Sequence, residues 1–320
     1  MNKKILITGA TGFVGSYLVD FLLKNTKDKI LGTYYSDNSL GMLGANVGKI
    51  ETFKIDLRNW DEVSKLISKT EPDIVYHLAA FASAAKSFSS PTEAVINNIS
   101  SELNILEAIR QTKLLGTKIL IVSSAEVYGH VDEKYLPINE DTPLNPTNPY
   151  AVSKVAQDFF GKQYFTTYAL QTIIVRPFNH IGPRQSDNFV VSSFAKKIAE
   201  IEKDKRNPVI PVGNLKAKRD FTDVRDVVRA YHLLMEKGKI GDVYNIGSGR
   251  SYKISDILDK LLSFSDKKIF VETDKTLLRP VDDPELTCDS SKIKKAINWK
   301  PEIPLEETLR DTLDYWRNII

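Results

Sequence analysis

A glycine-rich segment near the start of the chain lies between a short apolar run and an amphipathic stretch. The apolar run, residues 5–7, is typical of a buried parallel strand, and apolar residues at helical spacing follow over residues 14–23. Between them, Gly9, Gly12 and Gly15 recur at every third position. Small residues let the backbone approach a pyrophosphate at a helix N-terminus, where free N–H groups and the helix dipole attract anions. This context predicts a dinucleotide site.

The same alternation of strand and helix continues through the first half of the chain. Further strands are expected at residues 30–34, 52–56, 73–80, 118–122 and 171–176, with helices at 61–68, 91–111 and 150–168. Alternating elements of this kind predict an α/β fold: a doubly wound parallel Rossmann sheet with right-handed crossovers.

After residue 176 the pattern becomes looser, because prolines divide the chain into shorter elements. We expect residues 1–178 to form the NAD(P)-binding Rossmann domain, with a later strand near 242–246 returning to its sheet. Residues 179–320 are expected to form a smaller, interleaved C-terminal α/β domain for the substrate.

Composition excludes several classes of protein. The 320 residues are 42% hydrophobic and 27% charged, and a net charge of +3 without a basic run gives no indication of nucleic-acid binding. A single cysteine, Cys288, and four histidines favour neither a disulfide nor a metal site, so no metal is expected. No apolar run reaches the ~20 residues that span a bilayer, and the first residues do not resemble a signal peptide. We therefore expect a cytoplasmic protein without a membrane partner.

A tyrosine and a lysine four residues apart follow Pro149, a residue that favours the first turn of a helix. On a helix, Tyr150 and Lys154 share one face, and the lysine charge is expected to lower the pKa of the phenol so that it can transfer a proton. Such a pair alone is common on helix surfaces. It gains specificity here because the glycine segment precedes it, and because Ser124 follows an apolar strand, at the sheet edge where ligands bind. Ser124, Tyr150 and Lys154 are the expected catalytic residues.

The expected cofactor-binding residues lie at the ends of the first four strands and on the catalytic helix. They are Gly9, Thr11, Gly12, Phe13, Val14, Gly15, Tyr35, Ser36, Asp56, Leu57, Leu78, Ala79, Ala80, Tyr150 and Lys154. An acidic residue at the tip of the second strand favours NAD, and an arginine favours NADP. Tyr34, Tyr35 and Ser36 stand there instead, so the choice between NADP(H) and NAD(H) stays open.

Taken together, these motifs resemble the extended short-chain dehydrogenases/reductases. The resemblance covers nearly the whole chain and rests on the glycine segment, Ser124, Tyr150, Lys154 and the later stretch 176–183 (Arg-Pro-Phe-Asn-His-Ile-Gly-Pro). It implies a nicotinamide cofactor in the N-terminal domain and a nucleotide-linked sugar in the C-terminal one. It also implies a homodimer built on the helix near Pro91 and the helix that carries Tyr150.

Within that family, three stretches resemble the GDP-6-deoxy-4-keto-D-mannose reductases, which form GDP-rhamnose, and the related GDP-mannose 4,6-dehydratases. They are residues 176–183, residues 212–221 and the segment around Arg279. The resemblance implies that Arg219 and Arg279 bind the diphosphate, which suits the planar guanidinium fork, and that Asn179 adds a neutral donor. Asp282 departs from the family pattern, because the dehydratases carry a glutamate there for the guanine, and its shorter carboxylate is expected to reach the base. Ser124 is also expected to contact the substrate.

The resemblance implies NAD(P)H-dependent reduction of the C4 ketone of a GDP-4-keto-6-deoxy-hexose. Tyr150 would donate the proton, Lys154 would assist it and Ser124 would orient the substrate oxygen. One alternative is a nucleotide-sugar 4,6-dehydratase in which Glu126 acts as base. A 4-epimerase is a third reading, and a non-catalytic nucleotide-binding scaffold is an alternative of another class. His180 is interpreted as a substrate-contact or packing residue, and His77 as a core residue near the cofactor.

Overall fold

The computed structural model describes residues 2–278 and 283–320. Its centre is a seven-stranded sheet in the order β10-β6-β5-β4-β1-β2-β3, in which all neighbouring strands are parallel. The strands are β1 (Lys4–Thr8), β2 (Lys29–Tyr34), β3 (Glu51–Lys54), β4 (Ile74–His77), β5 (Lys118–Val122), β6 (Gln171–Pro177) and β10 (Val243–Ile246). The doubly wound parallel sheet expected from the sequence is confirmed, and the strand expected near residues 242–246 is β10, which lies next to β6.

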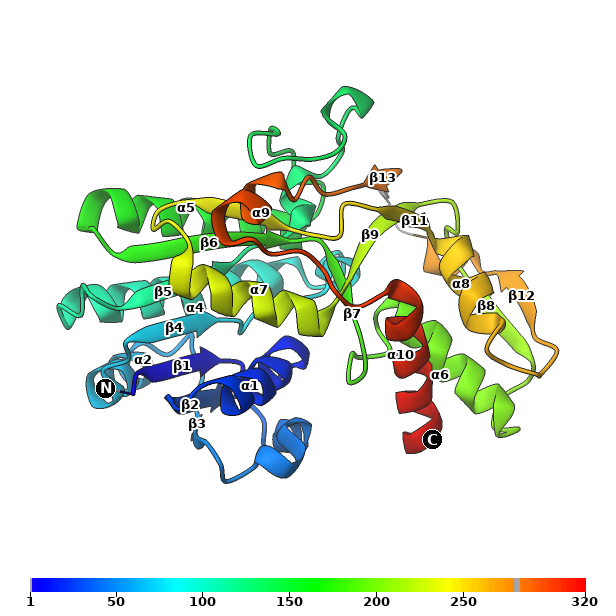
Figure 1. Ribbon diagram of the computed structural model, residues 1–320, viewed down its shortest axis with the longest axis horizontal. Coiled ribbons are helices and arrows are strands. Elements are labelled where there is room, and N and C mark those ends of the chain that lie inside the picture. Colours follow the sequence, from blue (N-terminus) through cyan, green and yellow to red (C-terminus); the bar gives the residue numbers. More distant parts are fainter. Residues whose placement is uncertain (1, 279–282) are drawn as a thin grey trace.

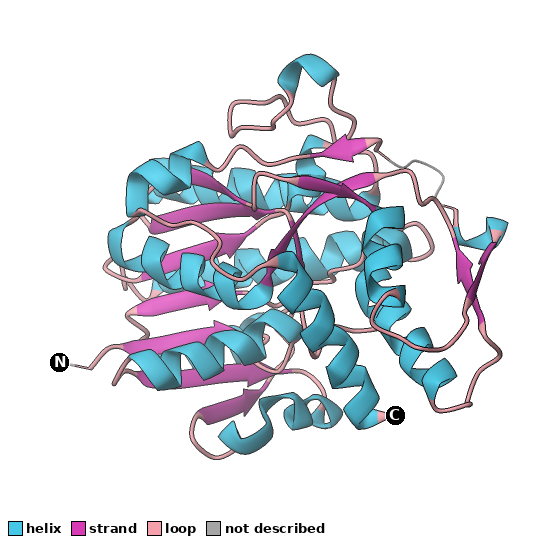
Figure 2. Cartoon of the chain, turned by 45° about the vertical axis from the view of Figure 1, so that its right-hand side comes forward, coloured by secondary structure: helices cyan, strands magenta, loops and turns pink. Residues whose placement is uncertain are grey.

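Helices cover both faces of this sheet because its strands are apolar on both sides (Figures 1 and 2). Ile5 and Ile7 of β1 pack in one core cluster with α1 and α7, whereas Leu6 packs in a second cluster with α2, α4 and α5. The bounds are α1 (Phe13–Asn25), α2 (Trp60–Thr70), α4 (Pro91–Gln111), α5 (Pro149–Tyr168) and α7 (Val224–Lys237). The helices expected at residues 61–68, 91–111 and 150–168 are therefore present.

The rest of the chain forms two small sheets and a second helical group. β9 (Lys218–Asp223) pairs with β7 (Asn179–Ile181), β11 (Ser251–Lys253) and β13 (Glu285–Leu286), and β8 (Val209–Val212) pairs with β12 (Phe270–Thr273). Helices α6 (Val190–Glu202), α8 (Ile254–Leu262) and α10 (Leu305–Ile319) share their own core cluster. The shorter elements are α3 (Ala84–Ser87), α9 (Ser291–Ile297), η1 (Asp37–Asn46), η2 (Ala125–Tyr128), η3 (Glu133–Tyr135) and η4 (Lys275–Leu277).

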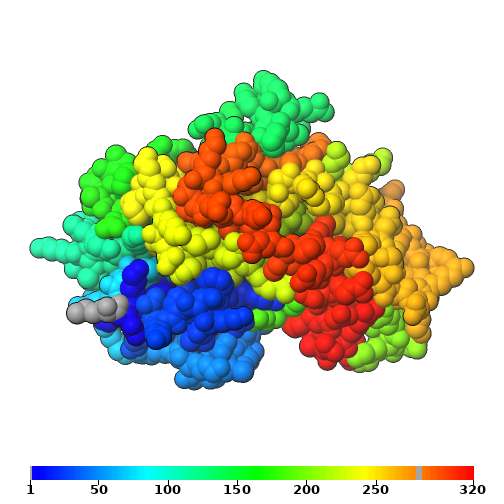
Figure 3. Space-filling model, viewed as in Figure 1, coloured from blue at the N-terminus to red at the C-terminus, as the bar shows by residue number. Residues whose placement is uncertain are grey.

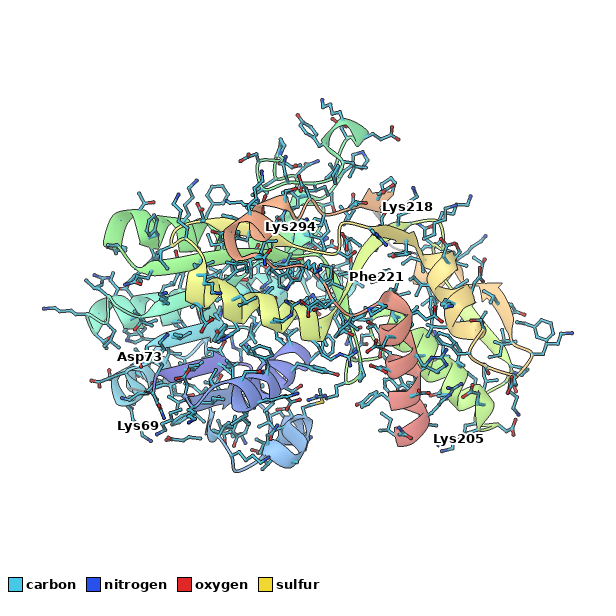
Figure 4. All side chains as sticks on the ribbon, viewed as in Figure 1. Lys69, Asp73, Lys205, Lys218, Phe221 and Lys294 are labelled. Atoms are coloured by element: carbon cyan, nitrogen blue, oxygen red, sulfur yellow. The ribbon has the colours of Figure 1, made fainter. Side chains whose placement is uncertain are left out.

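The C-terminal segment contacts both parts of the molecule. In the space-filling view its red surface runs from α9, which packs on β10 and α7, to α10, which packs on α6 and α8 (Figure 3). The carboxyl ends of the central strands point toward the junction of the two parts, and Lys69 and Asp73 lie at the opposite end (Figure 4). Ligands bind outside the carboxyl ends of parallel strands, so this junction is where a site is expected. In the described part of the chain, no helix is long and apolar enough to span a membrane.

Candidate active site

The glycine segment is packed so tightly that side chains would not fit. Gly9 has φ of +66°, and a Cβ there would lie 3.0 Å from the Cα of Ala79. A Cβ on Gly15 would lie 2.1 Å from the Gly9 carbonyl oxygen. Thr8 fastens this turn to the end of β4, since its Oγ1 accepts hydrogen bonds from the N–H groups of Leu78 and Ala79 at 3.0 and 3.1 Å. The residues expected to contact the cofactor at the ends of β1 and β4 therefore lie next to one another.

The N-terminus of α1 is suited to an anion. Gly12 occupies the N-cap position and no side chain caps the helix, so the first N–H groups, including those of Phe13 and Val14, have no side-chain partner there. The helix dipole adds positive potential at the same place. Thr11 lies beside them, and its hydroxyl is 2.7 Å from that of Ser39. This backbone arrangement fits the pyrophosphate of a dinucleotide.

The end of β2 carries a feature that the sequence reading missed. Tyr35, which is 67% exposed, lies under the guanidinium of Arg58, with 5.9 Å between Cζ and the ring centroid. The Arg58 side chain also donates three hydrogen bonds to the Asp56 carboxylate: from Nε to Oδ1 at 2.9 Å, from Nε to Oδ2 at 3.1 Å and from Nη2 to Oδ2 at 2.6 Å. The segment after β3 therefore places a positive charge, that of Arg58, near Tyr35 and Ser36 at the end of β2. The sequence contains this arginine two residues after Asp56, but no cofactor motif marks it.

Helix α5 begins where it does because of two local signals. The Asn148 side chain caps it by accepting a hydrogen bond from the Ala151 N–H at 2.8 Å, and Pro149 occupies the first turn. Tyr150 in this first turn and Lys154 one turn further on are both buried. Lys154 Nζ donates to the Val122 carbonyl at the end of β5 at 2.7 Å, and lies 5.8 Å from the Tyr150 ring centroid. The structure thus brings the predicted pair to the carboxyl end of β5.

Ser124 completes this group. It follows β5 directly and caps η2, with its Oγ accepting from the Glu126 N–H at 3.2 Å. The Ser124 side chain lies close enough to Tyr150 to lower the pKa of the phenol. Because α5 lies beside β5, serine, tyrosine and lysine meet although they are far apart in the sequence.

The electrostatics of the pair differ from the sequence-based expectation. Burial raises the pKa of Tyr150 to about 12. Ser124 lowers this pKa and Glu126 raises it, but burial has the largest effect. Lys154 is also desolvated, and burial lowers its pKa to about 8. The expected lowering of the tyrosine pKa by Lys154 is thus wrong for this arrangement, because the ammonium points to the Val122 carbonyl and burial dominates.

Glu126 is the fourth predicted catalytic residue, and it lies beside the other three. Its Oε2 accepts a hydrogen bond from Asn148 Nδ2 at 3.1 Å. Asn148 therefore joins the carboxylate to the first turn of the catalytic helix.

The expected substrate residues are only partly within the described chain. Arg219 on β9 is buried, and its Nη1 donates to the carbonyls of Lys218 and Asp283, both at 2.8 Å. Asn179, the exposed first residue of β7, pairs in register with Phe221, which Figure 4 labels at the junction of the two parts. Arg279 and Asp282 lie outside the described residues.

A cavity of about 240 Å³ opens between the two parts of the molecule. The segment after β4 contributes Ser83 and Lys86, and the segment before α6 contributes Asn188 and Phe189. The sequence reading selected none of these residues, since no motif marks them.

Burial favours the neutral form of both histidines near the site. His77 Nδ1 lies 2.9 Å from Thr8 Oγ1, and burial lowers its pKa to about 3. The His180 ring stacks on Phe13, with the centroids 6.1 Å apart, and burial lowers its pKa as well. His77 is therefore a core residue, and His180 is half-buried against Phe13. Among the described residues, no group of three or more histidine, cysteine or acidic side chains is arranged to hold a metal ion.

Comparisons with known proteins agree with this geometry. The family model described as GDP-mannose 4,6 dehydratase matches residues 6–312. The GDP-6-deoxy-D-mannose reductase of Pseudomonas aeruginosa is 32% identical, over 99% of this chain and 98% of that protein. GDP-mannose 4,6 dehydratase 1 of Arabidopsis thaliana is 29% identical, over 98% of this chain and 89% of that protein.

A solved structure gives the same result in three dimensions. The structure of RMD from Pseudomonas aeruginosa complexed with NADPH superposes with a TM-score of 0.87 at 31% identity, and all of each chain is covered. The match to the family model extends over nearly the whole length, from the first strand into the last helix. The chain therefore belongs to the GDP-mannose 4,6-dehydratase family of short-chain dehydrogenases/reductases.

Proposed function

We propose that this protein is an NAD(P)H-dependent oxidoreductase that reduces the C4 ketone of a GDP-linked 4-keto-6-deoxy-hexose, of the kind that yields GDP-D-rhamnose. One observation carries the proposal: Tyr150 lies with Ser124 and Lys154 at the carboxyl end of β5, and the glycine turn lies two strands away in the same sheet. The reductase from Pseudomonas aeruginosa supports the substrate class.

The residues divide the chemistry as follows. A bound nicotinamide cofactor supplies the hydride that adds to C4. Tyr150 gives its phenolic proton to the oxygen at C4, so that the ketone becomes an alcohol, and its raised pKa keeps it protonated until then. Ser124 donates a hydrogen bond to the same oxygen, and the Lys154 ammonium would bind the ribose of the nicotinamide.

The two parts of the chain take the two ligands in this proposal. Residues 1–178, with β10, hold the cofactor through Gly9, Gly12 and Gly15 and the strand-end residues predicted above. Residues 179–320 hold the nucleotide sugar, with Arg219, Arg279 and Asn179 at the diphosphate and Asp282 at the base. The Arg58 guanidinium beside Tyr35 is suited to both forms of the cofactor. It can bind a ribose hydroxyl of NAD(H) or the ribose phosphate of NADP(H).

A nucleotide-sugar 4,6-dehydratase is the second candidate function. It is favoured by the position of Glu126, two residues after Ser124 and close enough to Tyr150 to raise its pKa. In that reaction Glu126 would remove the proton at C5 while water leaves from C6. The Arabidopsis thaliana relative bears the name of such an enzyme.

A paired assay tests the proposal. We expect GDP-4-keto-6-deoxy-mannose to oxidise NADPH or NADH, with the product configuration read by NMR, and GDP-mannose with NADP⁺ or NAD⁺ to give no 4-keto product. The opposite result would establish the dehydratase. Cofactor binding without turnover of either substrate would favour the non-catalytic scaffold.

We further propose that the protein is a cytoplasmic homodimer that pairs through α4 and α5. Large apolar side chains lie on the outside of these two packed helices: Ile96 is 52% exposed, Val152 48% and Phe159 58%. Exposed apolar residues gathered on one surface are typical of an interface.

A further inference from the structure

The cavity at the junction of the two parts is lined from both sides. Residues 81–83 and 86, from the segment after β4, form one wall, and residues 186, 188 and 189, from the segment before α6, form the other. Lys86 is the one charged side chain among these seven, because the others are apolar, hydroxyl or amide side chains. The lining therefore carries a positive charge and no negative one, which favours an anionic ligand.

The Lys86 ammonium is left without an acidic partner. The backbone of Lys86 is fixed, since its N–H donates to Ser83 Oγ at 3.2 Å and its carbonyl accepts from Ser89 Oγ at 2.9 Å. Its exposed side chain, in contrast, forms no ion pair within 4 Å with any residue that the structure describes. Asp187, in the segment that forms the opposite wall, is bound to Lys196 at 2.7 Å. Many surface lysines are unpaired, but this one lines a cavity where its charge acts on whatever is bound there.

The hydroxyl groups of the lining are also available as hydrogen-bond donors. Ser83 Oγ accepts from the Lys86 N–H, and Ser186 Oγ accepts from Asn188 Nδ2 at 2.7 Å. Within the described part of the chain, neither hydroxyl hydrogen is donated to another residue, so each is free for a ligand oxygen. Both walls of the cavity therefore offer neutral donors beside the Lys86 charge.

Hydrogen bonds fix the wall after β4 to the catalytic turn of α5. The Phe81 N–H donates to Asn98 Oδ1 at 2.7 Å, and Asn98 Nδ2 donates to Ser153 Oγ at 2.8 Å. Ser153 Oγ in turn donates to the Tyr150 carbonyl at 2.7 Å. Helix α3, which carries Lys86, also packs on α5. The cavity is thus held in a fixed relation to Tyr150, and a ligand that reaches both is bound at two points.

We propose that Lys86 is a substrate-binding residue, whose ammonium holds the diphosphate of the nucleotide sugar from the cofactor-binding side of the junction. This inference rests on the proposed function, because that function supplies the substrate. The diphosphate is the only ionised group of a GDP-linked 4-keto-6-deoxy-hexose, so it is the group that a cation in this cavity attracts. Arg219 and Asn179, the expected diphosphate residues, belong to the other part of the chain. With Lys86, the diphosphate links the two parts.

The proposed contact affects substrate binding and not the chemical step. A lysine ammonium is a compact charge that donates hydrogen bonds to phosphate oxygens from several directions. The diphosphate does not change while the C4 ketone is reduced, so the contact is equally strong in the bound substrate and in the transition state. Lys86 therefore contributes to KM for the nucleotide sugar and not to kcat.

The kinetics of charge variants test the proposal. Lys86→Gln removes the charge and keeps a polar side chain, so KM for the 4-keto nucleotide sugar should rise about tenfold while kcat stays within about twofold. Lys86→Arg should keep KM near the wild-type value, and Lys86→Glu should raise it further than Lys86→Gln. The difference between wild type and Lys86→Gln should shrink between about 0.05 and 0.5 M salt, because salt screens exposed charges.

Lys69→Gln is the matched control. It makes the same change at an exposed lysine at the opposite end of the molecule, so KM should stay at the wild-type value (Figure 4). An unchanged KM in Lys86→Gln would overturn the proposal. An equal rise of KM in all three Lys86 variants would also overturn it, because a steric role does not depend on the sign of the charge.

A second measurement does not depend on turnover. The protein is first saturated with NADPH, which fills the cofactor site, and is then titrated with GDP, UDP and dTDP in a calorimeter. For the nucleoside diphosphate that binds most tightly, Kd should rise about tenfold in Lys86→Gln, whereas Kd for its nucleoside and for NADPH should not change.

The two measurements separate this proposal from the proposed function. If Kd rises as expected while neither substrate of the paired assay reacts, the diphosphate site is right and the reductase function is wrong. If the reductase assay succeeds while Kd is the same in Lys86→Gln, or while none of the three nucleoside diphosphates binds, the site is wrong and the function stands. A weaker Kd for NADPH in Lys86→Gln would assign the charge to the cofactor and overturn the proposal.

Discussion

Tyr150 has two properties that a proton donor needs, a buried phenol that stays protonated and a hydroxyl group, that of Ser124, close to it. Burial raises the pKa of Tyr150 to about 12, and Ser124 opposes part of this shift. Neither property follows from the sequence motif alone, because the motif gives the spacing of Tyr150 and Lys154 and not their solvent exposure. The chemistry at this residue is therefore a consequence of the packing of α5 on β5.

Removing the phenolic oxygen tests this directly. Tyr150→Phe should lower turnover by about 10²–10⁴-fold, because the alkoxide loses its proton donor, while cofactor binding followed by fluorescence persists. Tyr164→Phe, on the same helix but bonded to Glu107, should keep wild-type turnover. Full turnover in Tyr150→Phe would assign the proton to another group.

The glycine turn gives a second prediction for a single residue. Gly15→Ala would place a Cβ 2.1 Å from the Gly9 carbonyl oxygen and 2.9 Å from the Ala10 Cα, both in the backbone. We expect a loss of roughly 1–3 kcal/mol in the free energy of unfolding, measured with urea, together with weaker cofactor binding. Gly41→Ala meets no atom within 4 Å and should leave both unchanged. Equal stability of the two variants would show that the turn can relax.

Among the helices and strands, α5 contributes most to the site, and its N-terminal turn determines how the site residues are placed. Asn148 accepts a hydrogen bond from the Ala151 N–H and donates one to Glu126, so one side chain both caps the helix and holds the carboxylate. The helix start therefore sets the positions of Tyr150 and Glu126 together.

Two substitutions separate these tasks. Asn148→Ala removes both contacts and should cost about 1 kcal/mol in unfolding free energy as well as lowering turnover. Asn148→Asp keeps the cap acceptor but not the Nδ2 donor, so its stability should stay closer to wild type while turnover still falls. If both variants keep full turnover, the Asn148–Glu126 contact has no part in the reaction.

The sequence predicted those helices and strands that local sequence signals specify. The central strands and the helices at residues 61–68, 91–111 and 150–168 were predictable because their apolar periodicity is strong and because Pro149 marks a helix start. The small sheet around β9 was not, since β7 and β13 are very short and their pairing joins distant segments. Arg58 and the cavity by Lys86 were missed for a related reason: each belongs to a site only through the fold.

At the scale of the whole molecule, the outer faces of α4 and α5 set the expected assembly. Phe159→Glu places a charge in the proposed interface and should convert the dimer into a monomer, because burying an unpaired carboxylate is costly. Size-exclusion chromatography with light scattering measures this. Phe270→Glu, on exposed β12, is the control and should keep the dimer mass. A wild-type monomer, or a Phe159→Glu dimer, would contradict the interface.

The position of β10 has a consequence for how the protein is made. Its residues, 243–246, come late in the chain, yet they pair with β6 at the margin of the central sheet. While the ribosome is still adding the intervening residues, β6 is an uncovered edge that another strand can join. The first part of the molecule thus matures only after most of the second has been synthesised, and a gene cut after codon 178 would encode a sheet with an open, aggregation-prone side.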